Sequence, residues 1–233
     1  MTSPRSASVV VALLAPMAFA LCLALPSALG KPATGRIVGQ LKVLAKGEPK
    51  SDSKGAFVYV VGYTEPPPRG AVPTIRQKDK AFDPALLAIT AGQEVSFPNG
   101  DPFFHNVFSL SPARKFDLGQ FKKGESKAKL FPNPGVIDVY CNIHPQMAAT
   151  ILVLPNRRFA TTAADGKFAI EGVRAGTWSL FAYSRLAEKP VKTQVSVNAG
   201  ATTEASLTID ETRDSLDHKN KYGEGYRNPA KYR

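Results

Sequence analysis

Cysteine is scarce in this chain of 233 residues, which contains only Cys22 and Cys141. Cys22 lies inside an apolar N-terminal stretch, and loss of that stretch would leave Cys141 without a second thiol. A fold held together by disulfide bonds is therefore excluded, as is any site that needs two thiolates. An unpaired thiol in an oxidising compartment is open to oxidation unless it is buried or bound. The surroundings of Cys141 in the sequence are therefore the first place to look for function.

A sustained helical period with helix caps is also missing. The chain instead has runs of β-branched and aromatic residues, separated by breaks rich in Gly, Pro, Asn and Asp. These runs are Phe57–Val61, Val136–Tyr140, Thr150–Leu154, Trp178 with Leu180, and Leu207 with Ile209. Short strands at this spacing predict an all-β fold of the sandwich or barrel type.

Apolar runs long enough to cross a bilayer are absent after residue 30. Residues 1–30 have the three parts of a secretory signal. These are a positive charge at Arg5, an apolar stretch from Val9 to Leu25, and small residues that end at Gly30. We therefore predict that residues 1–30 are a signal peptide, with a retained membrane anchor as the alternative. The protein is expected to be periplasmic or secreted, with no membrane span after signal removal.

Acidic residues are too few to balance the basic ones: 19 Asp and Glu oppose 30 Lys and Arg, for a formal charge of +11. Such a charge favours acidic surfaces, which could belong to a protein, a nucleic acid or an anionic membrane. We expect no nucleic acid as a partner, because no nucleic-acid motif is present and the protein is predicted to be exported. Residues 113–130 carry six bases and two acids, which indicates either a solvated face or a surface for an acidic redox partner.

Two breaks divide the chain, the proline-rich stretch 64–70 and the charged stretch 156–158. They predict one domain at 72–155 and a segment at 158–209 that is too short to bury a core alone. We therefore expect residues 35–66 to supply the first strands of an accessory sandwich completed by 158–209, with 72–155 inserted between them. The alternative places 35–66 at the edge of the 72–155 domain. Residues 210–233 are polar and without periodicity, which predicts a flexible tail in which His218 is solvated.

The residue types that a mononuclear copper ion requires are gathered in the 72–155 domain. Cys141, His144 and Met147 follow the spacing C-x2-H-x2-M, and His105 comes 36 residues before the cysteine, after an Asn-Gly-Asp turn. Copper that alternates between two oxidation states is suited by thiolate and thioether sulfur together with imidazole nitrogen. A single thiolate with a methionine favours copper over zinc, and a binuclear copper centre would need a second cysteine. A thiol hydrolase is not expected, because no further acid–base partner accompanies the pair.

At these residues the chain resembles the cupredoxins, the blue type 1 copper proteins. The loop of Cys141, His144 and Met147 is similar to that of amicyanin, and the stretch from Phe82 to Val107 looks like plastocyanin. The resemblance implies a Greek-key sandwich of eight strands, in which His105, Cys141 and His144 are strong copper ligands and Met147 is a weak axial one. Plant plastocyanin has an acidic docking surface, however, whereas this chain is basic.

The cupredoxin resemblance also implies roles for neighbours of the ligands. Asn106 matches an asparagine that hydrogen-bonds the ligand loop. Tyr140 matches an aromatic residue proposed as a second route for electrons. In the family the edge of the second histidine, here His144, reaches the surface through an apolar patch, for which Pro145 and the loop 102–104 are the candidates in this chain.

A second resemblance covers residues 158–209. The stretches Thr161–Phe168 and Gly172–Leu180 look like the carboxypeptidase regulatory-like or transthyretin-like sandwich modules of exported proteins, and Gly35–Gly39 is similar to their first strand. These modules imply adhesion or scaffolding, without catalytic residues. The expected architecture is thus a cupredoxin sandwich plus a second small β-sandwich of the transthyretin/carboxypeptidase-regulatory type.

Together these features predict a protein that is not an enzyme. We expect an exported type 1 copper protein whose single copper ion cycles between Cu(I) and Cu(II). It would transfer single electrons between periplasmic redox partners, such as a c-type cytochrome or a periplasmic dehydrogenase. The alternatives are a copper-binding scaffold or accessory subunit of a larger redox or cell-surface assembly, and a copper storage or delivery protein.

Overall fold

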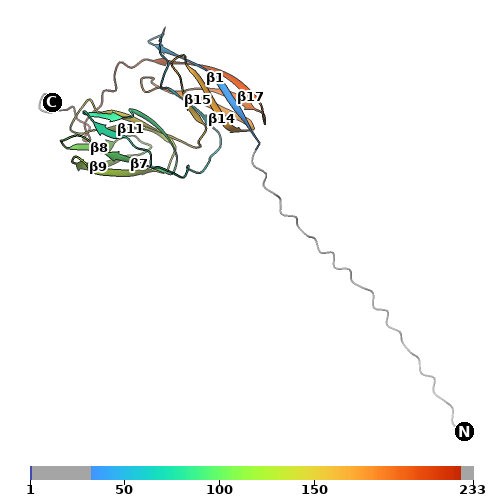
Figure 1. Ribbon diagram of the computed structural model, residues 1–233, viewed down its shortest axis with the longest axis horizontal. Coiled ribbons are helices and arrows are strands. Elements are labelled where there is room, and N and C mark those ends of the chain that lie inside the picture. Colours follow the sequence, from blue (N-terminus) through green and yellow to red (C-terminus); the bar gives the residue numbers. More distant parts are fainter. Residues whose placement is uncertain (2–32, 227–233) are drawn as a thin grey trace. The chain divides into compact units, whose positions relative to one another are not determined.

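The structure, a computed structural model, describes Met1 and residues 33–226 (Figure 1). All but the first residue of the predicted signal peptide, and the last seven residues of the chain, lie outside the described residues. Within the described range every regular element is a β-strand, so the predicted all-β fold is confirmed. These residues accordingly contain no helix that is long and apolar enough to span a membrane.

One sandwich is built from the two ends of the described chain. Its first sheet has the order β14-β1-β17, with β2 beside β1, and its second has the order β13-β3-β15-β16. The strands are β1 (Thr34–Ala45), β2 (Glu48–Pro49), β3 (Phe57–Val61), β13 (Phe159–Thr161), β14 (Lys167–Arg174), β15 (Gly176–Tyr183), β16 (Val191–Val197) and β17 (Thr202–Glu211). The strands of residues 34–61 therefore pair with strands that follow residue 158.

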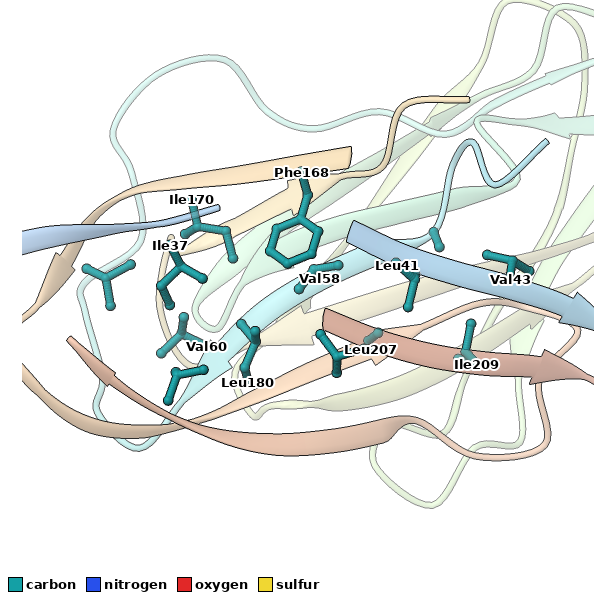
Figure 2. Close-up of a cluster of buried hydrophobic side chains, with 14 of the residues drawn as sticks. Ile37, Leu41, Val43, Val58, Val60, Phe168, Ile170, Leu180, Leu207 and Ile209 are labelled. Atoms are coloured by element: carbon teal, nitrogen blue, oxygen red, sulfur yellow. The ribbon is translucent and has the colours of Figure 1, made fainter. Parts of the chain in front are cut away.

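Alternating apolar residues make the core of this accessory sandwich. In β1 the side chains of Ile37, Leu41 and Val43 are buried and lie on one face of the strand, as a period of two requires. Figure 2 shows them converging with Val58 of β3 and Ile209 of β17. Neither half of the sandwich could bury these residues alone, which explains why the early and late strands need each other.

The second sandwich, formed by residues 75–154, carries the candidate ligands. Its largest sheet has the order β6-β12-β11-β8-β9, and two pairs, β10-β7 and β4-β5, complete it. The strands are β4 (Arg76–Lys78), β5 (Ala81–Asp83), β6 (Leu86–Thr90), β7 (Gln93–Pro98), β8 (His105–Ser109), β9 (Phe116–Phe121), β10 (Ser126–Phe131), β11 (Gly135–Tyr140) and β12 (Ala148–Leu154). Its core contains Phe97, Phe121 and Phe131, and extends to Cys141 and Met147.

A smaller apolar cluster joins strand β12 of the ligand-bearing sandwich to the accessory sandwich. Leu152 and Leu154 of β12 pack with Phe57 and Tyr59 of β3 and with Tyr183 of β15. Five side chains that are each at least 92% buried make this a continuous part of the interior rather than a loose linker. Strand β12 thus packs against the core of its own sandwich on one face and against the accessory sandwich on the other. It begins directly after the ligand loop.

Candidate metal centre

The ligand loop is the turn between β11 and β12. The two strands pair in an antiparallel register that ends with Tyr140 opposite Ala148, so Cys141 and Met147 are the next opposed residues. The N–H of Cys141 donates to the carbonyl of Met147 over 3.2 Å, and the N–H of Met147 donates to the carbonyl of His144 over 3.1 Å. These two bonds fold residues 141–147 back on themselves, which explains why the three sequence positions come together.

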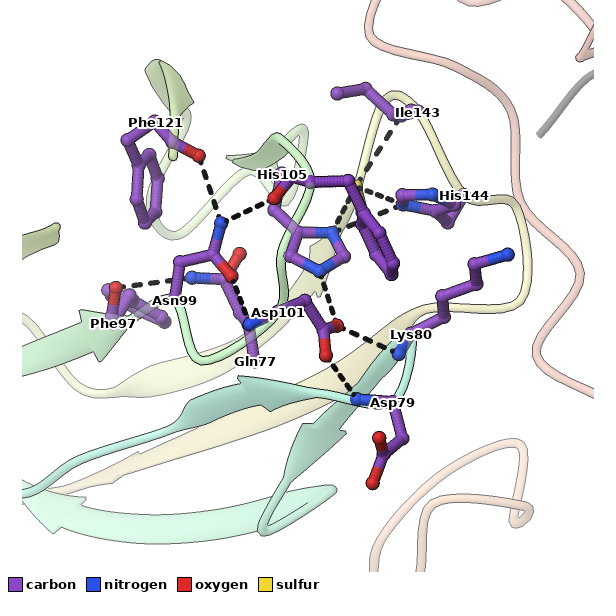
Figure 3. A network of polar contacts seen from close by, with 12 residues as sticks. Gln77, Asp79, Lys80, Phe97, Asn99, Asp101, His105, Phe121, Ile143 and His144 are labelled. Carbon is purple, nitrogen blue, oxygen red and sulfur yellow. Dashed lines mark hydrogen bonds and ion pairs between the residues drawn. The ribbon is translucent and has the colours of Figure 1, made fainter. Parts of the chain in front are cut away.

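The fourth candidate ligand comes from the neighbouring strand. His105 is the first residue of β8, which pairs with β11 through Phe108 and Tyr140. This pairing brings His105 beside the ligand loop although 36 residues separate it from Cys141. The ring of His105 points toward His144 and the loop in Figure 3.

Three donor atoms form a tight triangle. Nδ1 of His105 and Nδ1 of His144 are 3.1 Å apart, and each lies 3.8 Å from Sγ of Cys141. All three side chains are buried. A metal with bonds of about 2.0 Å to nitrogen and about 2.3 Å to sulfur separates its ligand atoms by about 3 to 4 Å. The three side chains therefore fit a copper site.

A carboxylate determines which ring nitrogen of His105 carries the proton and which can bind a metal. Oδ2 of Asp101 lies 2.8 Å from Nε2 of His105. Because an ionised carboxylate only accepts hydrogen bonds, Nε2 carries the proton and Nδ1 presents its lone pair to the thiol. Metal-binding histidines commonly have such a partner, which sets both the tautomer and the orientation of the ring.

Asp101 is itself held ionised by its surroundings. The carboxyl is buried, which opposes ionisation, but the N–H groups of Lys80 and Asp79 and the ring of His105 donate to it and lower its pKa. Asn99 accepts from the N–H of Asp101 and donates to the carbonyls of Phe103 and Phe121 (Figure 3). This loop was identified in the sequence only as a turn, and the carboxylate four residues before His105 was missed.

Burial controls the protonation of the other two donors. It lowers the pKa of His144 to about 4, with a further contribution from His105, so this imidazole is neutral near pH 7. It also raises the pKa of the Cys141 thiol, against the opposing effect of nearby backbone N–H groups. In the absence of a cation the site therefore contains a neutral imidazole and a protonated thiol, and a bound metal would stabilise the thiolate.

Met147 shares the core with the thiol. Its side chain is fully buried and belongs to the same apolar cluster as Cys141. The structure thus brings His105, Cys141 and His144 together as a group and places Met147 at the end of the same loop. The role of Met147 as a fourth ligand stays a prediction.

The residues expected around the ligands lie close to them. The side-chain oxygen of Asn106 accepts from the N–H of Asn142 over 3.3 Å, so this asparagine does tie the ligand loop to β8. Tyr140 is half-buried against Phe108, with ring centroids 5.9 Å apart. Pro145 is half-buried on the loop, next to His144.

An apolar patch lies beside the two histidines. The ring of Phe103 is 5.3 Å from both His105 and His144, measured between centroids. Phe104 is 52% exposed, which is unusual for so large an apolar side chain. The loop 102–104 therefore covers the histidine pair on one side and presents an aromatic ring to solvent.

The basic stretch 113–130 consists mainly of strands β9 and β10. Two of its lysines are not freely solvated. The ammonium of Lys127 lies 5.2 Å from the ring centroid of Phe121, and that of Lys129 lies 5.7 Å from the ring centroid of Phe116. Their stems cover the edge of the core, while Lys122 and Lys123 remain exposed.

The expectation that His218 is solvated is wrong. Its ring stacks on Tyr140 with centroids 3.9 Å apart and planes 13° apart. Nearby, the hydroxyl of Tyr226 donates to the carbonyl of Cys141 over 2.7 Å. The polar composition after residue 210 suggested a tail without partners, but the imidazole of His218 gains contact area on the ring of Tyr140, and the ring of Tyr226 packs edge-on against that imidazole.

Comparison with known proteins finds likenesses to separate parts of the chain. Residues 155–205 match the family described as polysaccharide lyase family 4, domain II. This range covers much of the accessory sandwich and contains none of the candidate ligands. No curated protein matches the chain.

Likenesses among solved structures include copper proteins. A purple cupredoxin from Nitrosopumilus maritimus is 23% identical with a TM-score of 0.32, over 35% of this chain and 99% of that one. An amicyanin mutant in the Cu(I) form is 16% identical with a TM-score of 0.35, over 42% and 98%. A copper-containing nitrite reductase from Thermus scotoductus SA-01 is 24% identical with a TM-score of 0.35, over 41% and 25%. Because each match covers less than half of this chain, the assignment of the site depends on its own side chains.

Proposed function

We propose that the protein is an exported type 1 copper protein that transfers single electrons between redox partners. The observation that carries this proposal is the buried triangle of one thiol and two imidazole nitrogens, with the tautomer of His105 set by Asp101. Such a donor set, with a single sulfur of high affinity for Cu(I) and nitrogens suited to both oxidation states, favours copper over other metals.

In this proposal Nδ1 of His105, Sγ of Cys141 and Nδ1 of His144 would hold the copper ion strongly, and the thioether of Met147 would be its weak fourth ligand. Copper held there would supply one-electron chemistry by alternating between Cu(I) and Cu(II). The protein's part is to hold the ligands nearly still: His105 is bonded to Asp101, and the loop is bonded to Asn106 and closed on itself. Ligands that move little keep the reorganisation energy of electron transfer small.

The partner is proposed to be another redox protein, such as a c-type cytochrome or a periplasmic dehydrogenase. Phe103 packs against the histidine pair, and the exposed ring of Phe104, the next residue, suits close apolar contact with a partner. Exposed lysines such as Lys122 and Lys123 would favour an acidic docking face and make the association rate sensitive to salt. We propose a periplasmic or secreted location, no role for nucleic acid, and no membrane span once the signal is removed.

A scaffold or accessory subunit is the second candidate. It is favoured by the accessory sandwich, which has a core of its own and carries no candidate ligand. We propose that this sandwich is a module of the transthyretin or carboxypeptidase-regulatory type that attaches the copper domain to a larger assembly. Copper storage or delivery is less favoured, because all three donors are at least 96% buried and exchange would require the loop to open.

Addition of one equivalent of Cu(II) to the purified protein tests the first proposal. We expect an intense blue or violet thiolate-to-copper band and a fast, reversible one-electron wave. Cys141→Ser should remove the band while the far-ultraviolet circular dichroism stays unchanged, because serine is close to cysteine in size. Native protein without the band, or a Cys141→Ser protein that keeps it, would refute the ligand assignment. A stable partner that co-purifies and is lost with residues 158–209 would favour the scaffold.

A further inference from the structure

The segment Leu216–Tyr226 follows β17 without regular structure and returns to the ligand loop. The hydroxyl of Tyr226 donates to the carbonyl of Cys141, with 2.7 Å between the oxygens. The N–H of Lys221 donates to the side-chain oxygen of Asn142 over 2.9 Å. Two consecutive residues of the ligand loop are therefore held from outside by a segment about 80 residues further along the chain.

A closed cycle of hydrogen bonds runs through this contact. Lys221 bonds Asn142, the N–H of Asn142 donates to Asn106, and the amide of Asn106 donates to Asp117 over 2.6 Å. The cycle closes where the ammonium of Lys221 meets the other oxygen of Asp117 at 2.7 Å. Strands β8 and β9, the ligand loop and the C-terminal segment are thus joined, and no member can move without breaking two bonds.

An aromatic contact forms the second half of the attachment. His218 lies flat on Tyr140, the residue before Cys141. Its Nε2 is 3.0 Å from the hydroxyl of Tyr226, whose ring meets the imidazole edge-on with centroids 5.4 Å apart. The segment therefore contacts the ligand loop and the last residue of β11 at points on either side of the Cys141 backbone.

We propose that Leu216–Tyr226 is a clasp that positions the ligand loop in the metal-free protein and slows exchange of the bound ion. Inside the sandwich the loop is fixed by its own two backbone bonds and by Asn106. The carbonyl of Cys141 and the side-chain oxygen of Asn142 accept their bonds from the clasp. Release of the clasp frees the loop to open and exposes the thiol. The statement about exchange rests on the proposed copper function, whereas the statement about position does not.

Reactivity of the Cys141 thiol in the metal-free full-length protein tests the positioning role. The protein is treated with iodoacetamide, and modification of the Cys141 peptide is followed by mass spectrometry, which separates it from Cys22. Tyr226→Phe keeps the ring but removes the hydroxyl that bonds the Cys141 carbonyl and contacts Nε2 of His218. We expect it to raise the labelling rate at least about tenfold, the effect of losing one good hydrogen bond. Tyr222→Phe is the matched control, because Tyr222 belongs to the same segment and is 72% exposed; its rate should stay within about twofold of native.

Variants of Lys221 test the other attachment. Lys221→Met should also speed labelling several-fold, because it removes the ammonium from Asp117, and Lys221→Arg should restore the native rate. The urea midpoint of each variant shows whether faster labelling comes from local opening of the ligand loop, which leaves the midpoint unchanged, or from a loss of global stability, which lowers it. The proposal is overturned if Tyr226→Phe labels at the native rate, if Tyr222→Phe has the same effect, or if each rate increase only follows the loss of global stability.

Transfer of Cu(I) to a chelator tests the exchange role. We expect loss of the ion from Tyr226→Phe to be about tenfold faster than from native protein, with Tyr222→Phe unchanged. Equal rates in all three would overturn the exchange role. A protein that takes up no copper while the labelling difference persists would refute the proposed function and support the clasp as a positioning element.

Discussion

Replacement of Asp101 by asparagine should raise the reduction potential of the copper-loaded protein. The carboxylate is buried and bonded to His105 at 2.8 Å, on the side of the ring opposite the donor nitrogen. Its negative charge favours the more positive oxidation state of a metal held by that nitrogen. At roughly 7 Å and an effective dielectric constant of 20 such a charge contributes about 2.4 kcal/mol. For one electron this corresponds to about 100 mV.

Asparagine has nearly the same shape and can still accept from one of the N–H groups of Asp79 and Lys80. We therefore expect a rise of about 50 to 100 mV, measured by protein-film or solution voltammetry at constant pH and ionic strength. Asp79→Asn is the control, because it makes the same change of charge at an exposed neighbour whose left-handed backbone, with φ of 54°, suits asparagine. A potential that falls or stays constant in Asp101→Asn, or that rises equally in Asp79→Asn, would refute the role assigned to this carboxylate.

Three further predictions concern stability and access. The metal-free protein should lose up to about 3 kcal/mol of unfolding free energy between pH 6.5 and pH 4. The pKa of His144 is lowered to about 4 in the folded state, so as the pH falls the unfolded chain binds the proton first and is stabilised. Urea titrations with equal midpoints across this range would contradict the burial argument. Ile137→Ala should cost about 3 kcal/mol of unfolding free energy, because the Ile137 side chain is fully buried in the core of the ligand-bearing sandwich and its loss leaves a cavity. An unchanged urea midpoint would show that it does not pack there. Phe104→Ser should change the unfolding free energy by less than about 0.5 kcal/mol. It should nevertheless slow electron self-exchange of the copper-loaded protein, measured by nuclear magnetic resonance line broadening. An unchanged self-exchange rate would show that the loop 102–104 is not part of the docking surface.

The fold class was predictable because β-branched and aromatic runs have few alternatives. Phe57–Val61 was identified with its observed bounds, and Val136–Tyr140 lacked only Gly135. Strand β10 was missed because Ser126–Phe131 alternates lysine with small or apolar residues, a pattern that is equally typical of a solvated stretch. The positions of Lys127 and Lys129 in a strand are explained only by the structure, in which their ammonium groups lie over the rings of Phe121 and Phe116.

The donor set was predictable because its chemistry is selective and its spacing is local. Cys141 and His144 lie in one turn, and only His105 had to be brought from another strand. The contacts that fix these donors were not predictable to the same degree. Asp101 looked like part of a turn, and nothing in a polar sequence without periodicity says that Tyr226 reaches the carbonyl of Cys141. Such contacts depend on how distant segments pack, and single-sequence patterns carry little information about packing.

The parallel pairing of β1 with β17 joins the first and the last strand of the described chain. Synthesis delivers β1 first and β17 last among the strands, so the inserted sandwich with its donors emerges in full before the accessory sheet can be closed. The residues of the clasp come later still, directly behind β17. In the order of synthesis the three candidate donors therefore precede both the strand that completes the accessory sheet and the residues proposed to hold the ligand loop.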